Sequence, residues 1–316
     1  MSTDRTWKSL GASKSPILHL IPKACADENA AYEFMEARRW GDSPCCPHCG
    51  ELAVYKMSSA SGGRNKRFLW RCRGCKKQFT VRTGTVCEES RIPLRHWCFA
   101  FWAISSSKKG ISSLQIMRMT GITYKSALFM MHRVRWALSG SPKLRGIVEV
   151  DETYCGGRPR NKGPHNKRGM GTKKIPVVAL VERGGNVRAL PVEKVDAITL
   201  RKIINDTVET GSRIMTDENS VYPSATAGYS HESINHSQKE WVRGDVTTNT
   251  AEGFFSLVKR GLYGTFHAVS RKHLHRYISE FQFRYCARKI DDSDRMELAI
   301  KNAVGKRLMY QEAKAS

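Results

Sequence analysis

Acidic residues are scarce in this 316-residue sequence, which has 29 Asp and Glu against 53 Lys and Arg and a formal net charge of +24. A deficit of acids along the whole chain favours a polyanionic partner, most often nucleic acid. A basic ribosome-associated protein, or one that is merely soluble, has the same charge, so charge alone leaves those classes open.

Long apolar runs are also absent, although a hydrophobic content of 40% is normal for a folded protein with two or three modules. The most apolar stretches, 96–104 and 175–181, are far shorter than the roughly 20 residues that cross a bilayer. The opening stretch MSTDRTWKSLGASK lacks the apolar core of a signal peptide. We therefore expect a cytoplasmic, nucleoid-associated protein without a membrane partner, whose ten cysteines are metal ligands or core residues rather than disulfides.

Four of the cysteines form two C-x2-C pairs that are 22 residues apart: Cys46 with Cys49, and Cys72 with Cys75. Two such turns deliver the four thiolates of a tetrahedral zinc site, and three strand-like segments surround them, at 51–57, 66–72 and 77–84. We predict a zinc ribbon over 44–90 with one structural Zn²⁺, because no position stays open for water. The alternative is a set of coincidentally buried cysteines. Two possible substitute ligands have the wrong offset to the second pair: Cys45 and His48.

Helical patterns flank this module, in an N-terminal segment over 1–43 and again over 91–140. Within 91–140, two helical stretches are divided at TGIT (120–123), and a short helix, a turn with Gly and a second helix have the proportions of a helix-turn-helix. Any tight helical hairpin has the same pattern, and the net charge favours DNA docking. The DNA-binding residues that we predict on the second helix are Lys125, Arg133 and Arg135.

From residue 146 the pattern becomes strand, strand, strand, helix, strand, helix, which predicts a mixed α/β (α+β) domain. Asp151 and Asp217 each lie at or just past the end of an apolar strand in this reading. Glu252 lies in TTNTAEGFFSLVKRG (247–261), a largely apolar helix with a narrow polar stripe that also holds Asn249 and Lys259. The three acids, far apart in the chain, are candidates for one site.

Three convergent carboxylates suit chemistry on phosphodiesters, which repel nucleophiles and have poor leaving groups. Two Mg²⁺ ions about 3.5–4 Å apart, with oxygen ligands, activate the attacking oxygen and stabilise the departing one. We predict that Asp151, Asp217 and Glu252 bind two catalytic Mg²⁺ ions. Lys259 and Arg260, about two turns after Glu252, would hold phosphates nearby.

Each acid also has a plain structural reading when it is taken alone. Asp151 can be a turn former, Asp217 the N-cap of a following helix, and Glu252 an ion partner of Lys259. The joint pattern of the three favours the metal site. The neighbouring acids that compete with the two aspartates are Glu152 and Glu218.

The segments VDETYCGGRPRNKG (150–163) and NTAEGFFSLVKRGLYGTFHAVSRKHLHRYISEFQFRY (249–285) closely resemble bacterial insertion-sequence transposases of the ISXO-like group. This is the DDE-class family numbered fifteen ninety-five. RWGDSPCCPHCG (39–50) and RCRGCKKQFTVRTGT (71–85) resemble the zinc ribbon of the same family. The resemblance covers roughly residues 20 to 290.

The resemblance implies a ribonuclease H-like catalytic domain over 146–290, with a helical tail over 291–316, and DNA cleavage followed by strand transfer. It implies Asp151, Asp217 and Glu252 as the metal-binding acids, Lys259 as the basic residue of the same helix, and Mn²⁺ as a substitute for Mg²⁺. Asn249 is kept as an accessory, since some members of the family have Asn as third ligand. No role follows for four histidines: His231, His236, His267 and His273.

The expected partners are transposon ends and target DNA, both double-stranded, and the pairing of two ends implies at least a homodimer in the active assembly. Two rival functions stay open at this point. One is a non-catalytic zinc-ribbon DNA-binding protein, a transposase relic or a regulator. The other is a metal-dependent nuclease that hydrolyses DNA without joining it.

Overall fold

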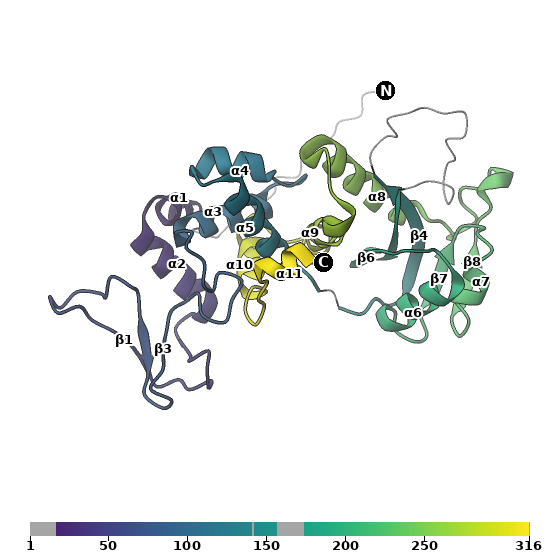
Figure 1. Ribbon diagram of the computed structural model, residues 1–316. Coiled ribbons are helices and arrows are strands. Elements are labelled where there is room, and N and C mark those ends of the chain that lie inside the picture. The colour runs from purple at the N-terminus through teal and green to yellow at the C-terminus, as the bar shows by residue number, and fades with distance from the viewer. Residues whose placement is uncertain (1–16, 141, 157–173, 316) are drawn as a thin grey trace, which may run out of the picture.

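The computed structural model describes residues 17–140, 142–156 and 174–315. A small ribbon, a helical body and a mixed sheet follow one another across the molecule (Figure 1). The expected combination of helix and sheet is therefore confirmed. Among the described residues, no helix is both long and apolar enough to span a membrane.

The ribbon is a three-stranded antiparallel sheet in the order β1-β2-β3. Trp70 and Phe79 are buried beneath it, and the ring of Trp40 meets both edge-on, so a few aromatic side chains supply most of this small core. All three strands that the sequence predicted here are present. Their bounds are Val54–Lys56 for β1, Trp70–Cys72 for β2 and Gln78–Phe79 for β3.

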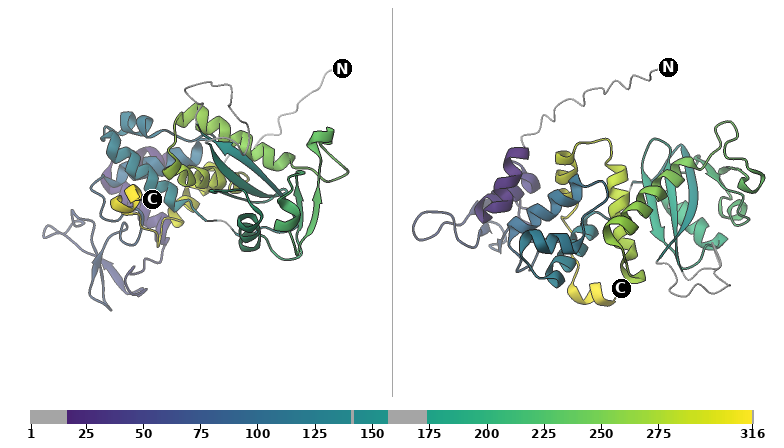
Figure 2. Two further views of the ribbon diagram at one scale, coloured as in Figure 1. Left: turned by 45° about the vertical axis from the view of Figure 1, so that its right-hand side comes forward. Right: turned by 90° about the horizontal axis from the view of Figure 1, so that it is seen from above.

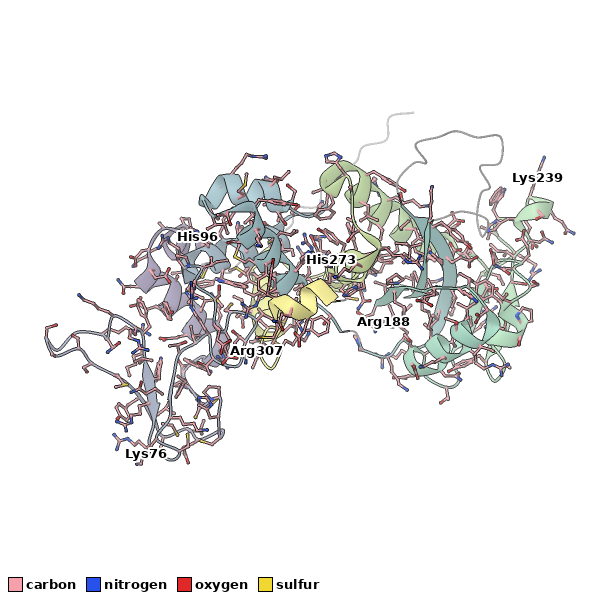
Figure 3. The ribbon with its side chains drawn as sticks, viewed as in Figure 1. Lys76, His96, Arg188, Lys239, His273 and Arg307 are labelled. Carbon is pink, nitrogen blue, oxygen red and sulfur yellow. The ribbon has the colours of Figure 1, made fainter. Side chains whose placement is uncertain are left out.

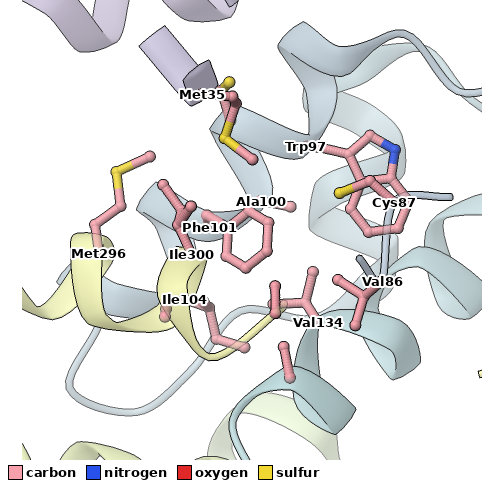
Figure 4. Packing of buried hydrophobic residues seen from close by; sticks show 14 of the residues in the cluster. Met35, Val86, Cys87, Trp97, Ala100, Phe101, Ile104, Val134, Met296 and Ile300 are labelled. Carbon is pink, nitrogen blue, oxygen red and sulfur yellow. The ribbon is translucent and has the colours of Figure 1, made fainter. Parts of the chain in front are cut away.

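The helical body has one core, to which segments from both ends of the chain contribute. Trp97, Phe101 and Ile104 of its central helix are fully buried, with Met35 on one side and Met296 on another (Figure 4). The segments predicted separately at 1–43, 91–140 and 291–316 thus pack together. The helices are α1 (Ile17–Ala26), α2 (Glu28–Trp40), α3 (Leu94–Ser106), α4 (Ser113–Thr120), α5 (Tyr124–Ala137), α10 (Asp292–Lys301) and α11 (Tyr310–Ala315).

The turn between α4 and α5 has the expected helix-turn-helix proportions. Gly121 adopts the left-handed conformation (φ 73°) that ends α4, and the side chain of Thr123 caps α5 through the N–H of Ser126. Tyr124 and Lys125 at the start of α5 are exposed. The second half of α5 is buried against α3 and against a helix of the sheet domain.

The large sheet has the order β6-β5-β4-β7-β8, in which β5 runs antiparallel to β4 and β6, and β7 and β8 run parallel to β4. The first four of these strands in chain order confirm the sequence prediction. The fifth, β8, was not predicted, because its sequence SHES is short and polar. The bounds are β4 Ile147–Cys155, β5 Ile175–Glu182, β6 Val187–Pro191, β7 Arg213–Thr216 and β8 Ser230–Ser233.

Helices cover both faces of this sheet (Figure 2). The alternation of β5 shows the two layers: Val177 and Ala179 face one helical layer, while Val178 and Leu180 face the other. The first layer has α8 (Asn249–Gly261) and α9 (Leu274–Cys286), and the second has α6 (Ala197–Thr207) and the short α7 (Tyr222–Ala225).

Candidate functional site

The four predicted zinc ligands form a compact group in which all sulfur atoms lie within 4.8 Å of one another. The Sγ atoms of Cys46 and Cys75 are 3.7 Å apart, and so are those of Cys49 and Cys72. A tetrahedral Zn²⁺ with Zn–S bonds of about 2.3 Å places its ligands about 3.8 Å apart, so the thiols fit the ion. Within the described part of the chain, no other group of three or more possible ligands is this compact.

Asp151 lies on β4, and Asp217 directly follows the adjacent parallel strand β7. The register pairs Val148 with Ile214 and Glu149 with Met215, and its continuation brings Asp217, directly after β7, level with Asp151. The expectation that Asp151 ends its strand was wrong. The strand β4 continues for four residues to Cys155, because the antiparallel pairing with β5 extends that far.

Glu252 lies in the first turn of α8. The apolar face of this helix packs on the face of the sheet that holds Val177 and Ala179. Phe254 and Val258 of that face are fully buried, whereas the Glu252 side chain is 52% exposed. Asn249, the first residue of the helix, is also exposed. The helix therefore presents Glu252 at an open edge of the site rather than inside the core.

The pKa of Asp151 depends on its burial and on the charges of the other acids. Burial, followed by the negative charge of Glu152 and then of Asp217 and Glu252, raises the pKa of Asp151 to about 7, against the effect of a hydrogen bond of 2.7 Å from the N–H of Glu152. No Lys or Arg of the described residues forms an ion pair with it. The three predicted acids thus influence one another electrostatically, with His236 as their ionic neighbour among the described residues, and oxygen ligands of this kind fit a hard divalent cation.

The carboxylates are nevertheless more widely spread than the thiols. They are not among the described groups whose ligand atoms all lie within 4.8 Å. The ring of His236 lies beside them, with Nε2 4.0 Å from Oε1 of Glu252, and it counteracts the burial-driven rise in the pKa of Asp217. This histidine, to which no role was assigned from the sequence, is therefore a polar neighbour of two of the acids.

Glu152 and Glu218, the neighbouring acids that compete with the two aspartates as metal ligands, are hydrogen-bonded to other groups of the protein. Glu152 accepts hydrogen bonds from the Tyr222 hydroxyl (2.5 Å) and from the Asn219 amide (3.1 Å). Glu218 accepts from the hydroxyl and N–H of Ser237 and from the N–H of His236, contacts that lower its pKa to about 2. These contacts hold the 3-10 turn η2 (His236–Gln238) near the site.

The two basic residues of α8 are exposed, as a role at a phosphate requires. Lys259 lies close enough to Cys155 for its charge to oppose the burial that raises the pKa of that thiol to about 11. Lys259 thus lies near the end of β4, on the face of the sheet that α8 covers. It does not form the alternative ion pair with Glu252, whose ionic neighbour among the described residues is His236.

Two of the three predicted DNA-binding residues are buried, so the structure places them away from any ligand surface. The guanidinium of Arg133 donates to the carbonyl of Glu88 (2.6 Å), and Arg135 is fully buried, with Nε 2.6 Å from Oε2 of Glu280 on α9. Their basic character suggested a DNA-facing helix, but this half of α5 joins the helical body to the sheet domain. Lys125 is exposed, and its role stays a prediction.

Exposed basic side chains are found at both ends of the molecule. Lys76 lies on the ribbon and Lys239 directly after η2 (Figure 3). Nearer the acids, Lys259 and Arg260 are exposed on the helix that carries Glu252.

Comparisons with known proteins agree with this arrangement. The family model described as ISXO2-like transposase domain matches residues 143–285, and the one described as transposase zinc-ribbon domain matches residues 26–78, which together is more than half of the chain. The chain is 29% identical over 278 residues to the "uncharacterized protein in transposable element ISH50" of Halobacterium salinarum, covering 83% of this chain and 92% of that protein.

One solved structure with a weak likeness is a chain of the simian T-cell lymphotropic virus intasome in complex with PP2A regulatory subunit B56 gamma. Its identity to this chain is 13% and the TM-score is 0.26, with 53% of this chain and 60% of that chain covered. This chain therefore spans less than two thirds of that one. A likeness of this size carries no argument about the fold or the site.

Proposed function

Because this chain belongs to the ISXO2-like transposase family, we propose that it cuts DNA at the ends of an insertion sequence and joins the freed ends to target DNA. The observation that carries the proposal is the approach of Asp151, Asp217 and Glu252 to one another from β4, β7 and α8. The strand order, with β5 as the one antiparallel member, supports the ribonuclease H-like fold that the family implies.

Asp151 and Asp217 would hold both of two Mg²⁺ ions, and Glu252 would hold the second, with Asn249 as an accessory and Mn²⁺ as a substitute metal. When bound, such ions supply Lewis-acid activation of the attacking oxygen and stabilise charge on the leaving oxygen. The burial and the neighbouring negative charges that raise the pKa of Asp151 support this assignment, because a divalent cation would stabilise the ionised carboxylate.

The exposed side chains of Lys259 and Arg260 would orient the phosphate next to the acids, since both lie on α8 within about two turns of Glu252. The zinc ribbon and the α4–α5 turn would bind the terminal inverted repeats, with Lys125 as a contact. Zn²⁺ would be structural, because four thiolates complete its coordination. Two ends handled together would require a homodimer or a larger assembly.

The test is cleavage of a duplex that carries the DNA flanking the gene, in Mg²⁺, by wild type and by Asp217→Asn. We expect cleavage by the wild type, loss of it in the variant, and retention in Glu209→Gln, an exposed acid of the same domain. Cleavage that survives Asp217→Asn would contradict the catalytic assignment. Absence of cleavage in the wild type, with retained DNA binding, would favour the non-catalytic rival.

Pre-cut ends separate the transposase from the plain nuclease. Duplexes with a free 3′-hydroxyl at the element end are supplied together with a supercoiled target. Joined products, formed by attack of the 3′-hydroxyl on a target phosphodiester and release of a target 3′-oxygen, support the proposal. Hydrolysed target without joined products would favour a nuclease.

A further inference from the structure

Glu149 is a fully buried carboxylate two residues before Asp151, on the same face of β4. Its oxygens accept hydrogen bonds from the backbone N–H groups of Thr250 (2.7 Å) and Ala251 (3.1 Å) and from the Thr250 hydroxyl (2.8 Å). Arg183 adds two more from Nε (3.0 Å) and Nη2 (2.8 Å). The buried charge is thus fully paired, which burial requires.

These bonds replace a local helix cap. The N-cap residue of α8, Thr248, makes no capping bond with its side chain, so the first N–H groups of the helix need another acceptor. Glu149 provides it from a strand 101 residues earlier in the chain. A carboxylate at this end of a helix is also favoured by the helix dipole. The first turn of α8 is therefore fixed to β4, and Glu252 is the next residue after Ala251.

Arg183 connects the same carboxylate to the segment that leads into α8. Its Nη1 donates to the carbonyl of Asp245 (2.9 Å), and Nη2 contacts the sulfur of Met215 on β7 (3.2 Å). The carboxylate of Asp245 pairs in turn with Arg213 on β7. One network, anchored on the buried carboxylate of Glu149, therefore contacts the three elements that carry Asp151, Asp217 and Glu252.

We propose that Glu149 is a positioning residue: it holds the first turn of α8 so that Glu252 lies within reach of metal ions bound at Asp151 and Asp217. The inference rests on the proposed metal site, although it concerns metal affinity rather than the DNA reaction. A Gln at this position keeps the shape of the side chain. It cannot accept all five bonds, because its NH2 group would face N–H donors, so the turn should loosen.

The test measures Mn²⁺ binding to the full-length, zinc-loaded protein by electron paramagnetic resonance of free Mn²⁺, without DNA. We expect Glu149→Gln to weaken binding about 10- to 100-fold, the usual effect of losing a partner that orients metal ligands. The matched control is Glu280→Gln. Glu280 is equally buried and paired with two arginines, but it lies between α5 and α9, so its loss should leave Mn²⁺ affinity unchanged.

A second pair of variants, with smaller changes to the side chain, keeps the inference testable if Glu149→Gln fails to fold. Thr250→Val removes one hydrogen bond to Glu149 and leaves the backbone bonds in place, so Mn²⁺ binding should weaken, though by less. Thr248→Val changes the neighbouring threonine, whose hydroxyl does not cap the helix, and should bind Mn²⁺ like the wild type.

Wild-type affinity in Glu149→Gln, or in Thr250→Val where Glu149→Gln does not fold, would overturn the inference. So would equal weakening in Glu280→Gln or in Thr248→Val, because it would indicate general destabilisation. These results are separate from the fate of the proposed function. A wild type that binds Mn²⁺ but neither cuts nor joins DNA would refute the transposase reaction and leave the role of Glu149 intact.

Discussion

The zinc ribbon and the acidic site bring ligands together in different ways. The four thiols come from two tight turns and lie close enough for one tetrahedral ion, with 3.7 Å between the sulfurs of two pairs and all four within 4.8 Å. The acids come from two strands and a helix of one large domain, and their oxygens are not gathered as closely. In the thiol site, four thiolates would fill every coordination position of one ion. The acidic site is instead open at the exposed edge that Glu252 occupies.

This difference indicates what each ion does for the protein. The ribbon has a core of few aromatic side chains, so a bound ion is a large part of its stability. The sheet has two hydrophobic layers of its own, so we expect it to keep its fold without metal. The negative charge collected at its edge is instead a cost, which suits a site that acts on a ligand.

Removal of zinc should have the largest effect. For zinc fingers the metal contributes about 10–16 kcal/mol to folding, so we expect Cys72→Ser to unfold the ribbon. The measurements are zinc content and limited proteolysis, with new cleavage sites over 44–90 and loss of binding to element-end DNA. Cys286→Ser, a cysteine outside the zinc group, is the control. A protease-resistant ribbon without zinc would remove the contrast between the two sites.

Asp151→Asn should act in the opposite direction on stability. It removes a repelled, partly buried charge, so in buffer without Mg²⁺ the free energy of unfolding should rise by on the order of 2 kcal/mol. We expect Mg²⁺ to raise the melting temperature of the wild type and not that of the variant. If the metal-free variant were less stable than the wild type, other groups of the protein would already stabilise the negative charge of Asp151.

Loss of the positive charge of α8 should have a smaller effect. We expect Lys259→Gln to slow cleavage of element-end DNA about tenfold, which is about 1.4 kcal/mol of transition-state stabilisation. Mn²⁺ binding should not change, because Lys259 would contact phosphate and not metal. The control Lys202→Gln lies on α6, on the other face of the sheet. Equal slowing in both variants would indicate a general charge effect.

The change of stability over one pH unit near neutrality should be the smallest effect. In the folded protein, Asp151 has a pKa of about 7, above its ordinary value, so between these values the native state binds more protons than the unfolded state. Stability without Mg²⁺ should therefore fall as pH rises from 4 to 7, by about 1 kcal/mol over the last unit. Urea unfolding of wild type and Asp151→Asn at pH 6 and 8 isolates this contribution. Identical pH slopes would contradict the raised pKa.

Much of the fold was accessible to sequence reasoning because its signals are local. The alternating strands β4 to β7 and the apolar face of α8 were predicted from their periodicity. The limits of prediction were equally physical. The polar edge strand β8 has no apolar alternation. Arg133 and Arg135 looked like surface residues, but Arg133 is buried against Glu88 and Trp97, and Arg135 is buried against Glu280 of α9.

The identity and spacing of the zinc ligands depend on two short turns, so the amino-acid order alone specifies them. That three carboxylates share one electrostatic environment depends instead on the pairing of β4 with β7 and on the docking of α8. The capping of α8 by Glu149 has the same origin, since it joins residues 101 positions apart. Contacts of this kind leave no local pattern, because their distances are set by packing between elements.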